Sequence, residues 1–237
     1  MSANTDRAAT LREFGLDDDD LGVWEASGLE DDAFDDWLTD RVARRPTGAR
    51  ARDVYGADDV HDFARRAILD ALALGPADHV LDVGCGGGLL LRDALAKGAR
   101  ATGIDHSAEM VALARQRAPG AEVVLGRAEA LPFEAEAFSA VSMSVVFFFF
   151  DDPRSALREA RRVLGDRGRL AVYTTSEELR GTPAAPEPIA SRGHFYSDDA
   201  LAALAREAGF TQVMVRSGGG GQLLSGVKEG SRGQPLG

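Results

Sequence analysis

Residues 79–105 decide the fold of this chain, and they begin His79-Val-Leu-Asp82-Val-Gly84-Cys-Gly86-Gly-Gly88. The first five residues form a short apolar run that is typical of a buried strand. The glycines that follow favour a tight turn in which the backbone passes close to a ligand. A second apolar run, over residues 101–104, ends at Asp105. We therefore predict two neighbouring strands, each with a carboxylate near its carboxyl end.

The alternation of strand-like and helix-like stretches continues to residue 228. Strands separated by helices of this length imply right-handed crossovers, which predicts an α/β protein. The expected fold is a doubly wound, seven-stranded, mostly parallel Rossmann-like sheet with an N-terminal helical cap, and ligands of such sheets bind at the carboxyl ends of the strands. The other strands are predicted over residues 122–125, 138–149, 169–174, 211–216 and 222–228, and the helices over residues 60–72, 89–97, 153–164 and 197–209, with one more beginning after Ser107.

Acidic residues are concentrated at the start of the chain. The 237 residues include 27 Lys and Arg against 38 Asp and Glu, a formal charge of −11, and residues 1–40 alone hold 13 acidic and 2 basic side chains. Both tryptophans, Trp24 and Trp37, lie in this leader. Acidic residues interleaved with large apolar ones indicate short amphipathic helices that dock on another surface. We expect an acidic cap on the main domain, and a partner-binding arm is the alternative.

Three segments are predicted along the chain. Residues 1–52 form the acidic helical cap or arm and a basic hinge that contains proline and glycine. Residues 53–229 form the main ligand-binding domain. Residues 230–237 show no apolar periodicity and are expected to be a flexible tail.

Composition excludes several classes of protein. No stretch approaches the ~18–20 uninterrupted apolar residues of a membrane helix. Residues 1–7 lack the basic patch and apolar run of a signal peptide, so we expect a cytoplasmic protein with no membrane partner. The single cysteine, Cys85, excludes a disulfide framework and a cysteine-based metal cluster, and no metal site is predicted. The acidic balance disfavours nucleic acid, whose phosphates require local positive charge.

The glycine turn has two competing interpretations. A dinucleotide-binding turn has glycine at its first, third and sixth positions, but the sixth position counted from Gly84 is Leu89. Asp82 would also repel a pyrophosphate, whereas it suits a ligand that carries an ammonium group. Asp105 follows Gly84 by 21 residues, a spacing that suits a carboxylate accepting both hydroxyls of a ribose. A nicotinamide dehydrogenase is therefore disfavoured, and S-adenosylmethionine has the required ribose, ammonium and lack of phosphate.

Over about residues 55–228 the sequence resembles the class I S-adenosylmethionine-dependent methyltransferases, in particular the small-molecule group similar to the ubiquinone/menaquinone-type enzymes. Five motifs carry the resemblance, at residues 80–88, 103–107, 126–133, 158–170 and 194–210. The resemblance implies that residues 53–229 are a methyltransferase domain with S-adenosylmethionine as cofactor. The cofactor-binding residues that it implies are Asp82, Gly84, Cys85, Gly86, Asp105, His106, Ala128, Glu129 and Ser144.

Two stretches depart from the pattern of that family. Arg127 stands where the family usually has an acidic residue that contacts the adenine amine, so Glu129 or the backbone of Ala128 is an alternative acceptor. Residues 147–150 are four phenylalanines, where the family often has polar or histidine residues. Phe149 and Phe150 lie at and just past the predicted strand end and are candidate substrate-binding residues, which favours an apolar or aromatic acceptor.

Candidate catalytic residues are few. The resemblance makes Tyr55, just before the first helix of the main domain, a candidate to cover the methyl group, because a ring face near a sulfonium gains a cation–π attraction of roughly 0.5–2 kcal/mol. An aromatic side chain packed between cap and core is the alternative. His194 follows a proline-rich loop and is a candidate for both catalysis and substrate binding. The sequence thus predicts an enzyme that transfers methyl from S-adenosylmethionine to the oxygen, nitrogen or carbon of a small molecule. The alternative is a protein of the same fold that binds the cofactor without transferring methyl.

Overall fold

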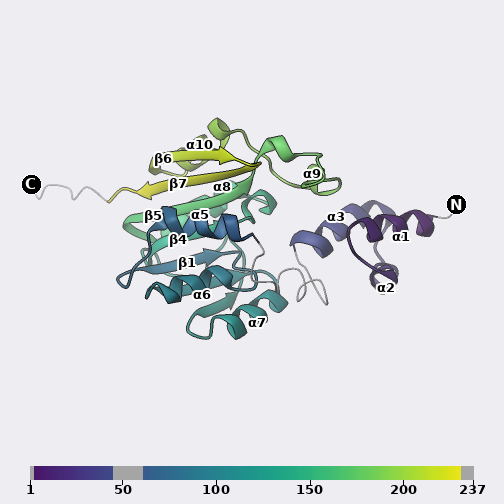
Figure 1. The fold of residues 1–237 in the computed structure, drawn as a ribbon, viewed down its shortest axis with the longest axis horizontal. Coiled ribbons are helices and arrows are strands. Elements are labelled where there is room, and N and C mark those ends of the chain that lie inside the picture. The colour runs from purple at the N-terminus through teal and green to yellow at the C-terminus, as the bar shows by residue number, and fades with distance from the viewer. Residues whose placement is uncertain (1–2, 45–60, 231–237) are drawn as a thin grey trace, which may run out of the picture.

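The computed structural model describes residues 3–44 and 61–230 of the chain. In these residues the strands form one seven-stranded sheet of order β3-β2-β1-β4-β5-β7-β6, in which β1 to β5 run parallel and β7 runs antiparallel to both β5 and β6 (Figure 1). The predicted fold class is confirmed. The strands are β1 (His79–Val83), β2 (Arg100–Asp105), β3 (Glu122–Leu125), β4 (Phe138–Ser144), β5 (Leu164–Thr175), β6 (Phe210–Gly218) and β7 (Gly221–Lys228).

Helices cover both faces of this sheet. Val80 belongs to a core cluster with α5, α6 and α7, and the next residue, Leu81, belongs to a cluster with α8 and α10. Successive strand side chains point to opposite faces, so a central strand covered on both sides is apolar throughout. None of the described helices has the length and hydropathy of a membrane-crossing segment. The helices of the main domain are α5 (Asp62–Leu72), α6 (Leu89–Ala96), α7 (Ala108–Arg117), α8 (Pro153–Val163), α9 (Ile189–Arg192) and α10 (Asp198–Glu207).

Local signals in the sequence set the starts of three of these helices. Ser107 caps α7 by accepting a hydrogen bond from the Met110 amide, and Ser197 caps α10 in the same way. Asp152 caps α8, whose first residue is Pro153. These side chains accept from amides that have no partner within the helix, which is why the helices begin there. The predicted starts of all three helices are confirmed.

The strand predicted over residues 138–149 is wrong in its second half. β4 ends at Ser144, Val145 adopts a left-handed conformation with φ 59°, and residues 147–149 form a 3-10 turn. The amide of Val145 still donates to the Tyr173 carbonyl, and the chain then turns off the sheet. The phenylalanines therefore gather at the carboxyl end of β4 instead of alternating between its faces.

Residues 3–44 form a small helical module with a hydrophobic core of its own. Its elements are α1 (Ala3–Glu13), α2 (Asp18–Ala26), α3 (Phe34–Thr39) and the short turns Asp31–Ala33 and Asp40–Arg44. Trp24, Phe34 and Leu38 are buried together, and the Arg7 guanidinium lies 5.5 Å from the Trp24 ring centroid. Asp17, in the four-aspartate run, accepts from the amides of Asp19 and Asp20 and so caps α2.

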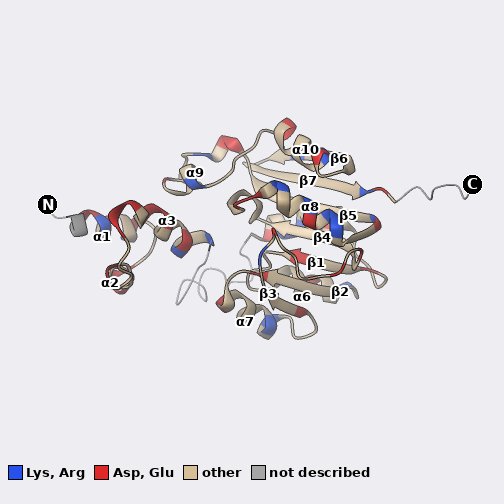
Figure 2. Ribbon diagram, turned by 180° about the vertical axis from the view of Figure 1, so that it is seen from behind, with Lys and Arg blue, Asp and Glu red and all other residues tan. Residues whose placement is uncertain are grey.

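This module lies to one side of the sheet, and its helices carry many acidic residues (Figures 1 and 2). Its core includes one residue from elsewhere in the chain, Ile189 of α9. Asp36 of α3 also forms an ion pair with Arg192, at 2.8 Å between Nε and Oδ1. The module therefore contacts the main domain through α9, in the region that the sequence predicted as a proline-rich loop. The segment boundaries at residues 52 and 229 stay predictions.

Phe147→Ala is expected to lower the free energy of unfolding by about 3–5 kcal/mol, because the Phe147 side chain is 0% exposed in the larger core cluster. Urea denaturation followed by circular dichroism measures the change. Phe149→Ala, in the same turn but half-buried, is the matched control and should cost less. Equal losses in the two variants would show that Phe147 does not anchor this turn.

Candidate functional site

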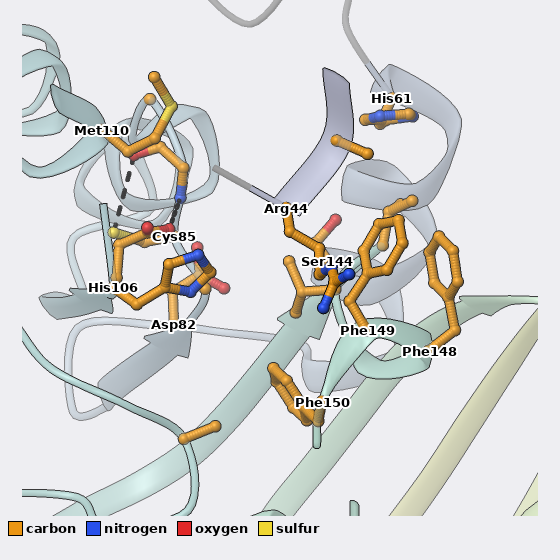
Figure 3. Close-up of a pocket in the computed structure, with 18 of the residues that line it drawn as sticks. Arg44, His61, Asp82, Cys85, His106, Met110, Ser144, Phe148, Phe149 and Phe150 are labelled. Atoms are coloured by element: carbon orange, nitrogen blue, oxygen red, sulfur yellow. Dashed lines mark hydrogen bonds between the residues drawn. The ribbon is translucent and has the colours of Figure 1, made fainter. Parts of the chain in front are cut away.

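A cavity of about 370 Å³ opens at the carboxyl ends of β1, β2 and β4. Small-molecule sites typically occupy ~300–1,000 Å³, so the cavity is large enough for a cofactor-sized ligand. Figure 3 shows Asp82, Cys85, His106 and Met110 on one side and Phe148, Phe149, Phe150 and Arg44 on the other. We call these the polar wall and the aromatic wall.

The glycine turn forms part of the polar wall, and its glycines have different reasons to be there. A Cβ on Gly84 would lie 2.8 Å from Val146 Cγ1, and a Cβ on Gly88 would lie 2.9 Å from Ala114 Cα. Both glycines have positive φ, so close packing and backbone conformation each require them. A Cβ on Gly86, by contrast, would meet nothing within 4 Å. Gly86 also has positive φ and lines the cavity, so its backbone is open on that side.

Asp105 joins the glycine turn to the end of β2. Its Oδ2 accepts a hydrogen bond from the Gly86 amide and its Oδ1 accepts one from the Ser107 amide, both at 2.9 Å. The side chain is 7% exposed and lines the cavity. Burial raises the pKa of Asp105, and the two amide donors oppose that rise. A carboxylate has about four lone-pair sites, so each oxygen can accept a further hydrogen bond from a ligand.

Asp82 lies on the neighbouring strand and is almost completely buried, with 1% of its surface exposed. The Ser142 hydroxyl of β4 donates to Asp82 Oδ1 at 2.7 Å. Burial raises the pKa of Asp82 to about 7, the charge of Asp105 adds to the rise, and the Ser142 hydrogen bond opposes it. The wall therefore carries two buried carboxylates on adjacent strands.

The structure brings together most of the residues predicted for the site. The nine residues predicted to bind cofactor all line the cavity, as do Phe149 and Phe150. Their binding roles stay predictions, now with a common location. Tyr55 lies outside the described residues. The nine are Asp82, Gly84, Cys85, Gly86, Asp105, His106, Ala128, Glu129 and Ser144.

His194 is absent from the described residues that line the cavity. Its amide donates to the Phe148 carbonyl at 2.7 Å, and its ring stacks on Tyr196 at 6.4 Å between centroids. His194 thus supports the turn behind the aromatic wall, and its predicted catalytic role stays a prediction without a geometric argument.

Several residues that line the cavity were not predicted from the sequence. Phe14 and residues 42–44 come from the helical module, and His61 and Arg65 come from the start of α5. His61 has a left-handed backbone conformation with φ 51°, and burial lowers its pKa below 6.5. No motif or spacing marks these residues, because they reach the cavity through packing between distant segments. The signal that the sequence offered for these lining residues was the presence of arginine and histidine beside apolar residues.

Arg127 pairs with acidic residues at the rim of the cavity. Its Nη2 lies 2.5 Å from Asp151 Oδ2, and its Nε lies 3.4 Å from Glu129 Oε2. The hydrogen bond that Arg127 donates to Asp151 is the main cause of the raised pKa of Arg127. The rim therefore retains carboxylates although an arginine occupies the position that is usually acidic. We expect Glu129 to remain an available acceptor for the adenine amine.

Comparison with known proteins agrees with this geometry. Residues 81–172 match the family model described as a methyltransferase domain. A demethylmenaquinone methyltransferase of Thermotoga maritima is 33% identical over 137 residues, which cover 57% of this chain and 58% of that protein. The chain spans about half the length of the first curated relatives that it matches, at 36%, 58% and 49%.

Solved structures give the same picture. An S-adenosylmethionine-dependent methyltransferase of Thermotoga maritima, described as a possible histamine N-methyltransferase, has a TM-score of 0.59 and 27% identity. That match covers 71% of this chain and 91% of the other. The [4+2]-cyclase SpnF has a TM-score of 0.60 and 21% identity, covers 79% of this chain and 87% of its own, and shows the fold alone.

The sheet order and these matches show a domain with the fold of S-adenosylmethionine-dependent methyltransferases. Among its sequence relatives are demethylmenaquinone methyltransferases, 33% and 36% identical over the matched residues. The solved structure of 27% identity is described as dependent on S-adenosylmethionine.

The residues of the polar wall fit that cofactor. Asp105 retains acceptor capacity that suits ribose hydroxyls, and the buried carboxyl group of Asp82 is the predicted partner of the ammonium group. The backbone at Gly86 is open between them. A pyrophosphate would instead meet two carboxylates in a site of low dielectric, where like charges repel strongly.

Asp105→Ala is expected to weaken the binding of S-adenosylhomocysteine at least tenfold, or about 1.4 kcal/mol, because the ribose hydroxyls lose their acceptor. Isothermal titration calorimetry measures the dissociation constant. Asp70→Ala, on the exposed face of α5, is the control and should bind normally. Unchanged affinity in a folded Asp105→Ala protein would remove Asp105 from the ribose site.

Proposed function

We propose that this protein is an enzyme that transfers the methyl group of S-adenosylmethionine to a small, apolar or aromatic acceptor. The observation that carries the proposal is that a polar wall with two buried carboxyl groups faces an aromatic wall across one cavity. One wall suits the polar cofactor and the other suits an apolar molecule. The acidic surface of the helical module supports a small-molecule acceptor over a nucleic acid, whose backbone it would repel.

The chain contributes mainly by positioning. S-adenosylmethionine, when bound, supplies a methyl group already activated on a sulfonium sulfur. Asp82 holds the ammonium group of the cofactor, and Asp105 holds its ribose hydroxyls. The aromatic wall holds the acceptor and excludes water. Fixing two reactants in one cavity can lower a barrier by up to ~7–11 kcal/mol in favourable cases, so a site without a powerful base can still be effective.

An acceptor that must lose a proton needs a base, and His61 is the residue that we propose for this role. It lines the cavity from the start of α5. Burial lowers the pKa of His61, so at neutral pH its imidazole is uncharged and able to accept a proton. An acceptor that attacks through an unprotonated nitrogen would not require it.

Calorimetry with S-adenosylmethionine and S-adenosylhomocysteine tests the cofactor, and mass spectrometry of a panel of apolar phenols, amines and acids incubated with S-adenosylmethionine tests the transfer. We expect binding and a product heavier by one methylene group. Binding without any methylated product would favour the alternative, a cofactor-binding protein with another role. The cyclase of the same fold shows that the architecture alone does not assign the reaction.

Phe149→Ala is expected to raise KM for an acceptor found in that panel about tenfold, with the affinity for S-adenosylhomocysteine unchanged, because the variant removes apolar surface from the aromatic wall alone. Steady-state kinetics give KM, and calorimetry gives the cofactor affinity. Phe63→Ala is the matched control, because Phe63 is 63% exposed and does not line the cavity. A parallel loss of cofactor affinity in Phe149→Ala would place this ring in the cofactor site instead.

A further inference from the structure

Ser142 lies behind the polar wall. It is in β4, it is 0% exposed, and it does not itself line the cavity. In the parallel pairing of β1 with β4, Ser142 is the direct cross-strand neighbour of Asp82. Its hydroxyl donates to Asp82 Oδ1 at 2.7 Å and lies 3.5 Å from the Leu81 carbonyl. Ser142 can therefore act on a ligand only through the carboxyl group that it contacts.

The surroundings of Asp82 disfavour its ionised form. Removal from water disfavours the carboxylate, and the carboxylate of Asp105 on β2 disfavours it further. Cys85 of the glycine turn adds no charge, because burial raises the pKa of its thiol. His106 acts on Asp105. Within the described chain, the other charged or titratable residues that line the cavity are Arg44, His61, Arg65, Arg127, Glu129 and Asp151.

Among the interactions resolved for Asp82, the Ser142 hydroxyl is the one that favours its ionised form. A hydroxyl can donate to an ionised carboxylate oxygen more strongly than to a neutral carboxyl group. The donor is fixed by the strand register, since the two residues face each other across adjacent strands.

We propose that Ser142 is a positioning residue of the cofactor site, which holds Asp82 in the ammonium-accepting carboxylate form, and that cofactor binding is coupled to release of the Asp82 proton. This inference rests on the proposed function, because it requires a ligand with an ammonium group in the cavity. It adds a residue that does not line the cavity and a proton that leaves when the ligand arrives.

The direction of the pH dependence follows from the raised pKa of Asp82. Below about pH 7 the free protein holds the proton, and the ligand must displace it. Affinity for the ligand should therefore rise with pH, by about tenfold per unit well below that pKa, and level off above it. Without Ser142, the same curve should move to higher pH.

The experiment is calorimetry with S-adenosylhomocysteine between about pH 5.5 and about pH 7.5, in pairs of buffers with different ionisation enthalpies. The buffer dependence of the heat gives the number of protons released. 5′-Methylthioadenosine is the control ligand, because it keeps the nucleoside and the sulfur and lacks the ammonium group. The proteins compared are wild type, Ser142→Ala, and Ser142→Thr, which retains a hydroxyl.

We expect wild-type binding of S-adenosylhomocysteine to release a proton below pH 7, and binding of 5′-methylthioadenosine to release none. Ser142→Ala should bind S-adenosylhomocysteine about tenfold more weakly at pH 6, bind 5′-methylthioadenosine normally, and shift the profile upward. Ser142→Thr should restore part of the effect.

Three results would overturn the inference. The first is a wild-type affinity that does not change with pH, which needs no variant and leaves the proposed function standing. The second is an unchanged profile in Ser142→Ala, and the third is an equal loss for both ligands, which indicates a merely structural role. Absence of S-adenosylhomocysteine binding at every pH would instead remove the proposed function and this inference together.

Discussion

The site depends on the burial of two carboxyl groups at the ends of neighbouring parallel strands. Asp82 and Asp105 are 1% and 7% exposed, so each needs hydrogen-bond donors that the fold itself supplies. Asp105 accepts hydrogen bonds from backbone amides of the glycine turn and of the start of α7, and Asp82 accepts one from the hydroxyl of Ser142. Buried charge is costly unless it is compensated in this way. The strand order β2-β1-β4 is what brings these donors to the two carboxyl groups.

The opposite wall has a different origin. The left-handed conformation of Val145 ends β4 early, and the turn that follows gathers the phenylalanines of residues 147–150 at the carboxyl end of this strand. Residues 42–44 approach the same space from the helical module, whose own core extends to Ile189 of α9. One wall is thus made by regular strands and the turn that follows them, and the other is made by an irregular turn and a separate layer of short helices.

The sequence was sufficient for the sheet and for the polar wall, because the determinants of both are local. Apolar runs, the glycine turn and helix caps such as Ser107 and Asp152 operate within a few residues of the structure that they specify. It was insufficient for the aromatic wall. The end of β4 is set by one positive φ at Val145, which β-propensity does not reveal. The pairing of Arg127 with Asp151, the contribution of His61 to the cavity and the hydrogen bond from Ser142 all join residues far apart in the chain.

The separate core of the helical module has an evolutionary consequence. Its interior is built around Trp24, Phe34 and Leu38, while the glycine turn packs within the sheet and its own helices. Sequence drift in residues 3–44 can therefore reshape one side of the chamber while the machinery on the other side keeps its form. Under the proposed function, an architecture divided in this way allows a lineage to exchange the small molecules that it accommodates without having to reinvent the means of holding its shared reagent.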